Sequence, residues 1–278
     1  GVLVLDVLFG APLQLSNPLG YSPLLAARFS GYGNLAYSAL ASAAVLLAGL
    51  IAHKIGGRRG ALVAIALLAV VFVVDGAPMW GSDVGGVLSI LPAFVVTGYL
   101  LLGIRIRLRN AFLALVAAVV ALVAFGLFDL TRPSDKQTHL GRLFETSQSR
   151  GWSGFSTVME RKIYENLSVF LRSTWLLVVI IVLSFLAYLY ARHHDRLSAI
   201  TAWVPELRAS FIGFAVLSVL GFAVNDSGIA VPGMMLSVLQ PTIIALLVLV
   251  ARRVAPPLAA PPEAAPPEAE PVPAATRA

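Results

Sequence analysis

The stretch AFLALVAAVVALVAFGLF, residues 111–128, is one continuous apolar segment without a charged or amide side chain. An α-helix rises about 1.5 Å per residue, so about 20 such residues cross the roughly 30 Å hydrocarbon core of a bilayer. Six further apolar segments of similar length occur along the chain. We therefore predict an all-α fold, a polytopic bundle of transmembrane helices.

The composition points to the same class. Of the 278 residues, 58% are hydrophobic and 12% are charged, whereas a soluble domain is about half apolar and about a quarter charged. This difference excludes a soluble globular enzyme. The chain has no cysteine, which excludes disulfides, thiol catalysis and cysteine-ligated metal. We expect no cofactor and no resident metal.

Seven full spans are expected, preceded by the last turns of an eighth, truncated span in residues 1–10. We expect residues 1–254 to form the transmembrane domain, which includes a long extracytoplasmic loop at 129–172. Residues 255–278 are rich in Pro, Ala and Glu and lack apolar periodicity, which is typical of a disordered tail. The seven spans are expected at about 34–52, 60–74, 85–104, 111–128, 173–190, 209–224 and 229–250.

The distribution of Lys and Arg predicts the orientation. The loops at 52–60, 105–110 and 191–208, together with the tail, carry twelve basic and five acidic residues. The alternate loops carry eight basic and nine acidic residues. Since basic loops stay in the cytoplasm, we expect a multi-pass protein of the bacterial plasma membrane with a cytoplasmic C-terminal tail. The net charge of +6 then reflects topology, and no nucleic-acid partner is expected.

Polar and ionisable residues gather at the predicted outer ends of the spans. Such groups are costly at a membrane boundary unless they are paired or face a wet cavity. We expect an extracytoplasmic polar site for an anionic or lipid-linked substrate; the alternative is a set of end caps and interface anchors solvated by lipid headgroups. The candidate site residues are Arg28, Asn34, Asp75, Asp83, Asp129, Arg132, His139, Arg142, Asn225 and Asp226.

The long loop carries the most polar part of this set. If residues 138–145 are helical, His139 and Arg142 share a face and can grip a phosphate, with the imidazole as acid or base. The alternative is a His/Arg pair lying at lipid headgroups. Apolar residues at helical spacing within 155–167 predict an amphipathic helix on the membrane surface.

Three further patterns concern packing. GYGNLA at 31–36 matches a dinucleotide fingerprint, but no strand precedes it, so its glycines predict a tight turn into the first span. Ser210, Gly213 and Gly221 share one face of the sixth span, where a neighbouring helix can approach closely. The seventh span carries Pro232, Gln240 and Pro241, which fits a broken helix lining a substrate path or an ordinary kinked helix.

Several stretches resemble a known family. FGAPLQLSNPLGYSPLLAARFSGYGN (9–34), DGAPMWGSDVGG (75–86), RPSDKQTHLGR (132–142) and ERKIYENLSV (160–169) are similar to segments of large multi-pass proteins of actinobacteria and Firmicutes. Members of that family carry an alkaline-phosphatase-like extracytoplasmic domain ahead of the membrane part. The resemblance implies a membrane module of a cell-envelope protein, truncated at its N-terminus. No catalytic residue is carried over, because these motifs have no established chemistry.

Three functions remain open. The chain is a membrane module of an envelope-acting protein, a transporter or flippase, or a structural membrane anchor. The chain by itself lacks a self-contained catalytic constellation, so we do not expect an independent enzyme. Membrane lipids, a lipid-linked anionic substrate and the missing N-terminal domain are the expected partners, and the oligomeric state is left open.

Overall fold

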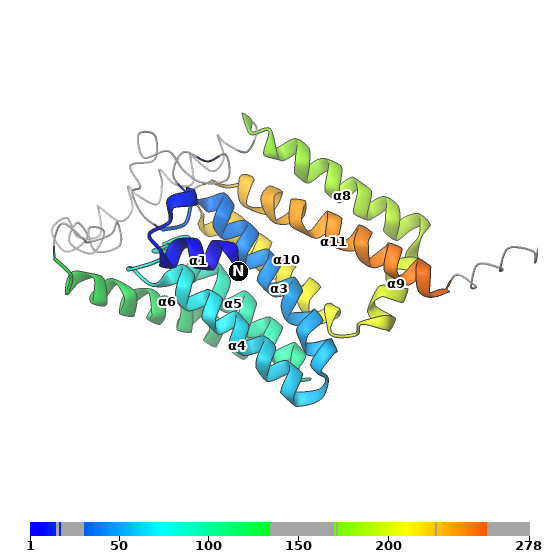
Figure 1. The fold of residues 1–278 in the computed structure, drawn as a ribbon, viewed down its shortest axis with the longest axis horizontal. Helices are drawn as coiled ribbons and strands as arrows, with labels where there is room; N and C mark the ends of the chain where they lie inside the picture. The colour runs from blue at the N-terminus through cyan, green and yellow to red at the C-terminus, as the bar shows by residue number, and fades with distance from the viewer. Residues whose placement is uncertain (15–16, 18–30, 134–169, 171, 226, 255–278) are drawn as a thin grey trace, which may run out of the picture.

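The computed structural model describes residues 1–14, 17, 31–133, 170, 172–225 and 227–254, and all regular structure in these ranges is helical (Figure 1). Seven of these helices are long and apolar enough to cross a membrane, which confirms the predicted all-α polytopic bundle. The seven are α3 (Asn34–Ile55), α4 (Gly57–Gly76), α5 (Val84–Leu101), α6 (Leu108–Leu130), α8 (Trp175–Arg192), α10 (Leu207–Val224) and α11 (Ala230–Val254).

The helix boundaries lie within a few residues of the predicted ones, and the differences have local causes. The turn between α3 and α4 is short, because Gly56 and Gly57 adopt φ values of +78° and +55° that other residues rarely tolerate. Gly103, at φ +70°, follows the end of α5. Residues 134–169 of the predicted loop at 129–172, and the predicted tail at 255–278, lie outside the described residues.

Three shorter elements accompany the spans: α1 (Val2–Leu8), the 3₁₀ turn η1 (Pro12–Gln14) and α9 (His194–Trp203). The expectation that 191–208 is only a loop was wrong, since α9 occupies its centre. Ile200 on α9 is buried at 1% exposure, and the Arg253 guanidinium of α11 lies 4.4 Å from the centre of the Trp203 ring. α9 packs on α11 and α8, and this packing stabilises a helix whose own hydropathy is too low to reveal it.

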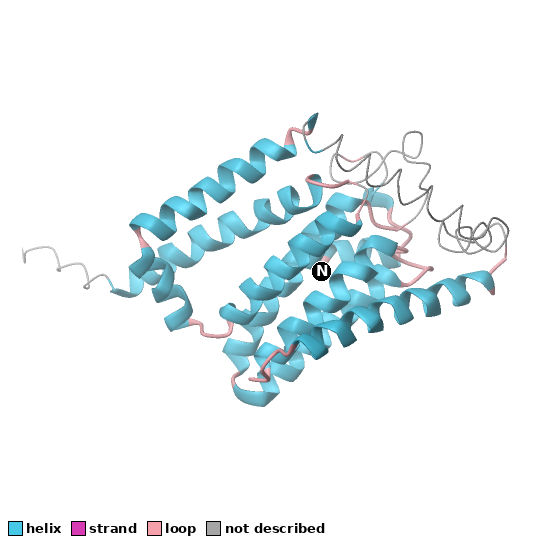
Figure 2. Ribbon diagram, turned by 180° about the vertical axis from the view of Figure 1, so that it is seen from behind, coloured by secondary structure: helices cyan, strands magenta, loops and turns pink. Residues whose placement is uncertain are grey.

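The core lies where α3, α4, α5, α10 and α11 pack together, whereas α6 packs mainly on α5 and α8 mainly on α11 (Figures 1 and 2). The peripheral helices α6 and α8 therefore expose most of their apolar side chains to the outside of the bundle. In a membrane, this surface faces lipid chains.

Small residues bring the central helices together, as the sequence predicted. A Cβ on Gly213 of α10 would overlap Thr97 Oγ1 of α5. The Ser210 hydroxyl donates across to the Val45 carbonyl of α3 at 2.7 Å. Gly221 lies against Val231 of α11. The predicted small-residue face of this span is confirmed.

The seventh span is one uninterrupted helix that runs through Pro241. Pro241 has no N–H to donate to the turn before it. The Ser237 and Thr242 hydroxyls donate to the carbonyls of Gly233 and Val238, at 3.0 and 2.8 Å. The hypothesis of a broken helix is therefore not supported, and the ordinary helix is what the structure has.

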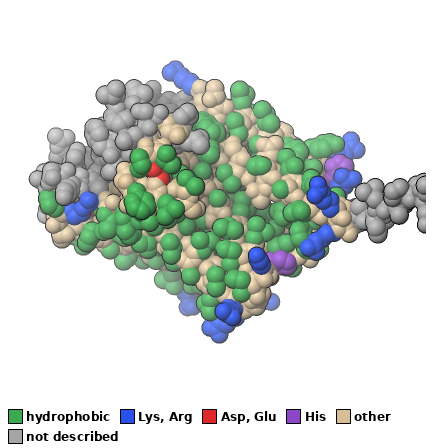
Figure 3. All heavy atoms as spheres, in the orientation of Figure 1, with side chains coloured by type: hydrophobic (Ala, Val, Ile, Leu, Met, Phe, Trp, Pro, Cys, Tyr) green, Lys and Arg blue, Asp and Glu red, His purple; other side chains and the backbone are tan. Residues whose placement is uncertain are grey.

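The two ends of the bundle differ in charge (Figure 3). We call the end that carries Asp75, Asp83 and Asn225 the polar end, and the opposite one the basic end. The basic end carries exposed cations at the helix ends and connections there: Lys54, Arg58, Arg59, Arg105, Arg107, Arg109, Arg192, Arg196, Arg208, Arg252 and Arg253.

Candidate functional site at the polar end

The connection between α4 and α5 folds back onto the end of α4. The Gly81 N–H donates to the Val74 carbonyl at 2.9 Å, and the Asp83 N–H donates to the Asp75 carbonyl at 3.1 Å. Ser82 adopts φ +50° within this reversal. Asp83 then takes the N-cap position of α5. The backbone thus places two aspartates that are eight positions apart next to each other.

Both carboxyl groups meet at Gly86, in the first turn of α5. A Cβ on Gly86 would overlap Asp75 Oδ2 and would lie 3.0 Å from Asp83 Cγ. Asp75 is 0% exposed and Asp83 is 3% exposed. Glycine is therefore the residue that lets the two carboxyl groups approach the helix backbone. Buried carboxyl groups are tolerated where donors, a counter-charge or a proton compensate for lost water.

Two asparagines complete the same region from other helices. Asn225, at the end of α10, accepts the Ser227 N–H at 3.2 Å, and a Cβ on Gly85 would lie 3.1 Å from its Nδ2. Asn34, at the start of α3, donates from its Nδ2 to the Ser227 hydroxyl at 2.5 Å. The starts of α3 and α5, the end of α10 and the turn into α11 therefore converge.

A tyrosine and a serine extend this region one turn deeper. The Ser89 hydroxyl donates to the Gly85 carbonyl at 2.8 Å, so the Tyr37 hydroxyl, 2.5 Å from Ser89 Oγ, is the donor between them. Both residues are 0% exposed. We call Asn34, Tyr37, Asp75, Asp83, Ser89 and Asn225 the polar cluster.

Sequence reasoning missed Tyr37, Gly86 and Ser89. Their spacing was the available signal. Tyr37 lies three residues after Asn34, and Gly86 and Ser89 lie three and six after Asp83, so each series follows one helical face inward.

Tyr32 lies beside the polar cluster and links it to the first residues of the chain. Its N–H donates to the Gly81 carbonyl at 3.0 Å, and its hydroxyl donates to the Leu3 carbonyl at 2.7 Å. Burial raises the pKa of the Tyr32 phenol, and the nearby carboxylates of Asp75 and Asp6 raise it further. Tyr32 therefore stays neutral and acts as a donor.

Asp6 is also buried, at 6% exposure. It accepts the Leu13 N–H at 2.8 Å and the Gln14 side-chain amide at 3.0 Å. These bonds fasten η1 to α1, which packs against α4.

Asp129 and Arg132 form a separate pair at the end of α6. Arg132 NH1 lies 3.0 Å from Asp129 Oδ1 and donates to the Pro78 carbonyl at 2.8 Å. This pair fastens α6 to the connection between α4 and α5. Its visible role is therefore to hold the connection that places Asp83 in the polar cluster.

The predicted site is thus assembled in part. The structure brings Asn34, Asp75, Asp83 and Asn225 together and places the pair of Asp129 and Arg132 at the end of α6, against the connection between α4 and α5. Arg28, His139, Arg142 and Asp226 lie outside the described residues, as does the amphipathic helix predicted within 155–167. Among the residues that are described, no three His, Asp or Glu side chains are grouped so that they could hold a metal ion.

Comparisons of the chain with known protein families, with characterised proteins and with solved structures find no match. The functional argument therefore rests on the residues and their geometry.

Proposed function

We propose that this multi-pass membrane protein is the membrane module of a bacterial envelope protein, and that its polar cluster binds the polar part of an anionic or lipid-linked substrate. The observation that carries the proposal is the convergence of polar side chains from α3, α4, α5 and α10 at one buried point. The connections at this end also carry Arg28, His139 and Arg142 in the sequence, which would supply positive charge.

Burial favours a binding site over a set of interface anchors. Side chains that only anchor a helix end to lipid headgroups reach into solvent, as the exposed arginines at the basic end do. In contrast, Tyr37, Asp75 and Ser89 are 0% exposed. Withdrawing such groups from water costs free energy, and a polar ligand is one reason for a membrane protein to retain them.

The transporter and flippase alternative has less support. Below the polar cluster, the buried hydroxyls of Ser42 and Thr97 donate to carbonyls of their own helices. Their neighbours in the central helices, among them Ala41, Val45 and Ala93, are apolar and fully buried. The described residues thus offer a polar site at one end rather than a polar path across the bundle.

The proposed orientation places the basic end in the cytoplasm and the polar cluster outside. Because the chain has no cysteine, labelling of single introduced cysteines can show which end of the bundle faces the cytoplasm. Thr131 is exposed at the polar end and Ser198 is exposed on α9. We expect a membrane-impermeant maleimide to label Thr131→Cys in intact cells and Ser198→Cys only after permeabilisation. The reverse pattern would place the polar cluster in the cytoplasm.

Native mass spectrometry of the mildly solubilised protein, followed by lipid extraction, tests the binding function. We expect the parent to retain an anionic lipid such as a polyprenyl phosphate, and Asn34→Ala and Asn225→Ala to lose it, because each removes an amide donor of the polar cluster. Ser198→Ala, at an exposed polar residue of α9, is the control and should retain it. Variants with parental thermal unfolding that keep the lipid would contradict the proposal and favour the structural anchor.

A further inference from the structure

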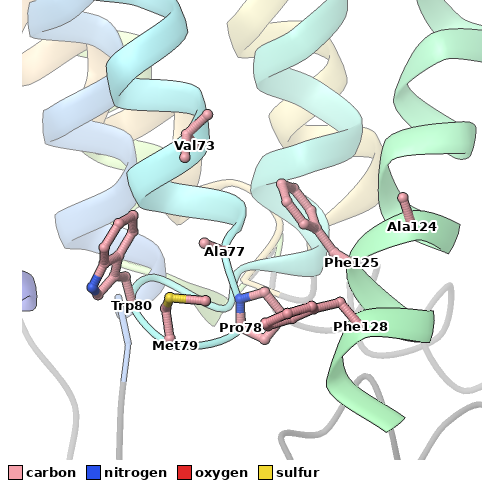
Figure 4. Close-up of a pocket in the computed structure, with 8 residues that line it drawn as sticks. All are labelled: Val73, Ala77, Pro78, Met79, Trp80, Ala124, Phe125 and Phe128. Atoms are coloured by element: carbon pink, nitrogen blue, oxygen red, sulfur yellow. The ribbon is translucent and has the colours of Figure 1, made fainter. Parts of the chain in front are cut away.

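An apolar groove lies beside the polar cluster, between the end of α4 and the end of α6 (Figure 4). It has a volume of about 360 Å³. Val73, Ala77 and Trp80 line one side, and Phe125 and Phe128 of α6 line the other. A space of this size with apolar walls suits an apolar chain rather than water.

The groove follows from how the helices pack. Both α4 and α6 pack on α5, so they flank it and leave a space between their ends. Phe125 reaches across this space, with its ring centre 6.0 Å from that of Phe72 and its edge against Gly76. Pro78 on the connecting loop is held by Arg132. The groove is therefore bounded by the contact between the Phe72 and Phe125 rings and by the loop at Pro78, which Arg132 holds in place.

The groove is open to the outside of the bundle. Val73 is 44% exposed, Met79 is 50% exposed and Phe128 is 45% exposed. On a membrane-spanning surface these side chains contact lipid, so a chain can enter the groove sideways from the bilayer.

Arg132 lies at the rim of the groove, where it donates to the Pro78 carbonyl and is ion-paired with Asp129. The Arg132 side chain is 22% exposed whereas the Asp129 side chain is 0% exposed. The cationic partner of this pair is therefore the one that reaches the surface. Arginine matches a phosphate well, because its planar donors can bond two oxygens at once.

We propose that the groove holds one hydrocarbon chain of a phosphate-headed lipid and that the phosphate lies at Arg132. This inference rests on the proposed function and deepens it, since it names the class of substrate: an anionic lipid, bound by its chain and its phosphate together. The remainder of the headgroup then lies toward the connection between α4 and α5.

Binding of three defined probes to the purified, delipidated protein tests the inference by native mass spectrometry. Phosphatidylglycerol has both chain and phosphate, diacylglycerol lacks the phosphate, and glycerol phosphate lacks the chains. We expect retention of phosphatidylglycerol and little retention of the other two. Equal binding of diacylglycerol would remove the role of Arg132, and equal binding of glycerol phosphate would remove the role of the groove.

Two variants address the two contacts separately. Ala124, on the α6 side of the groove, is exposed, so Ala124→Phe should fill the groove without disturbing the core. We expect it to weaken phosphatidylglycerol binding about tenfold or more, because excluded methylenes lose their burial. Val119→Phe adds the same kind of bulk on another face of α6, at a side chain that is 47% exposed, and should bind like the parent. Arg132→Gln should bring phosphatidylglycerol down to the level of diacylglycerol, and Arg132→Lys should restore part of the difference.

The outcomes separate this inference from the proposed function. If Asn34→Ala and Asn225→Ala abolish lipid retention while Ala124→Phe binds like the parent, the polar cluster is the site and the groove is not. If Ala124→Phe loses the lipid while the cluster variants retain it, the groove stands and the proposed role of the cluster falls.

Discussion

The Asp83 N–H donates to the Asp75 carbonyl oxygen at 3.1 Å, and this bond closes the connection between α4 and α5 upon itself. Both carboxyl groups are then buried against Gly86. The same connection carries Pro78, whose carbonyl accepts from Arg132. The connection between α4 and α5 therefore serves both features. It places Asp83 in the polar cluster, and its Pro78 lines the apolar groove between α4 and α6.

Gly86→Ala is expected to destabilise the protein. Its Cβ would overlap Asp75 Oδ2, so either the carboxyl group or α5 must move, and overpacking of this kind costs about 1–3 kcal/mol. Thermal unfolding in detergent measures the change. Gly98→Ala is the control on the same helix, because there the Cβ would meet the flexible side chain of Ile65 at 3.1 Å. Equal stability of both variants would show that Gly86 has room.

Tyr37→Phe and Ser89→Ala are expected to be coupled. The Tyr37 hydroxyl has Ser89 Oγ at 2.5 Å, and loss of a buried hydrogen bond costs about 0.5–1.5 kcal/mol net. The double variant should therefore lose less stability than the sum of the two single variants. A double-mutant cycle on unfolding free energies measures this coupling. Strict additivity would mean that the two hydroxyls do not interact.

Gly213→Ala is expected to loosen the contact between α5 and α10. The added Cβ would overlap Thr97 Oγ1, and Thr97 is buried at 0% exposure, so one of the two helices must shift. Removal of that oxygen by Thr97→Ala should restore most of the lost stability, since the next contact, with Thr97 Cβ, is 3.2 Å away. Thermal unfolding of the parent, both single variants and the double variant tests this. A double variant less stable than Gly213→Ala would contradict the assigned contact.

Tyr32 is expected to make the folding stability of the protein fall as the pH rises above about 10. Its pKa is raised above the ordinary value of 10.0, first by burial and then by Asp75 and Asp6. Above about pH 10 the unfolded chain loses this proton while the folded protein keeps it. The contribution of Tyr32 is therefore fully present below pH 10 and is lost as the pH rises further.

Tyr32→Phe provides the comparison. At pH 8 the variant should be less stable than the parent, because the Leu3 carbonyl loses its donor. At pH 11 the difference in melting temperature should be smaller, since the parent alone carries the penalty of the buried phenol. A difference that stays constant between the two pH values would show that Tyr32 titrates alike in both states.

The spans were predictable because hydropathy along a helix is a local property. Residues 111–128 identify α6 without reference to any neighbour, and the start of α3 at Asn34 follows the glycines that precede it. α9 was not predictable in this way. Its ten residues are stabilised by burial of Ile200 and by the contact between Trp203 and Arg253, which come from packing on α11.

Part of the candidate site was likewise predictable from the sequence, and part was not. The position of Asp75, Asp83 and Asn225 at the ends of apolar segments is visible in the chain, because charged and amide side chains interrupt hydropathy there. Their mutual contact is not visible, since it depends on the hydrogen bond that reverses the loop and on the absence of a Cβ at Gly86. The groove depends on the distance between α4 and α6, which both pack on α5.

Local chemistry in the sequence therefore sets the number of spans, their boundaries and the opposite character of the two ends, because burial of apolar side chains and the cost of exposed charge act residue by residue. Only the folded bundle determines which helix ends meet, which polar groups are buried together and where an apolar space remains. Those features arise from steric contacts between residues far apart in the chain, such as Gly213 with Thr97 and Arg132 with Pro78.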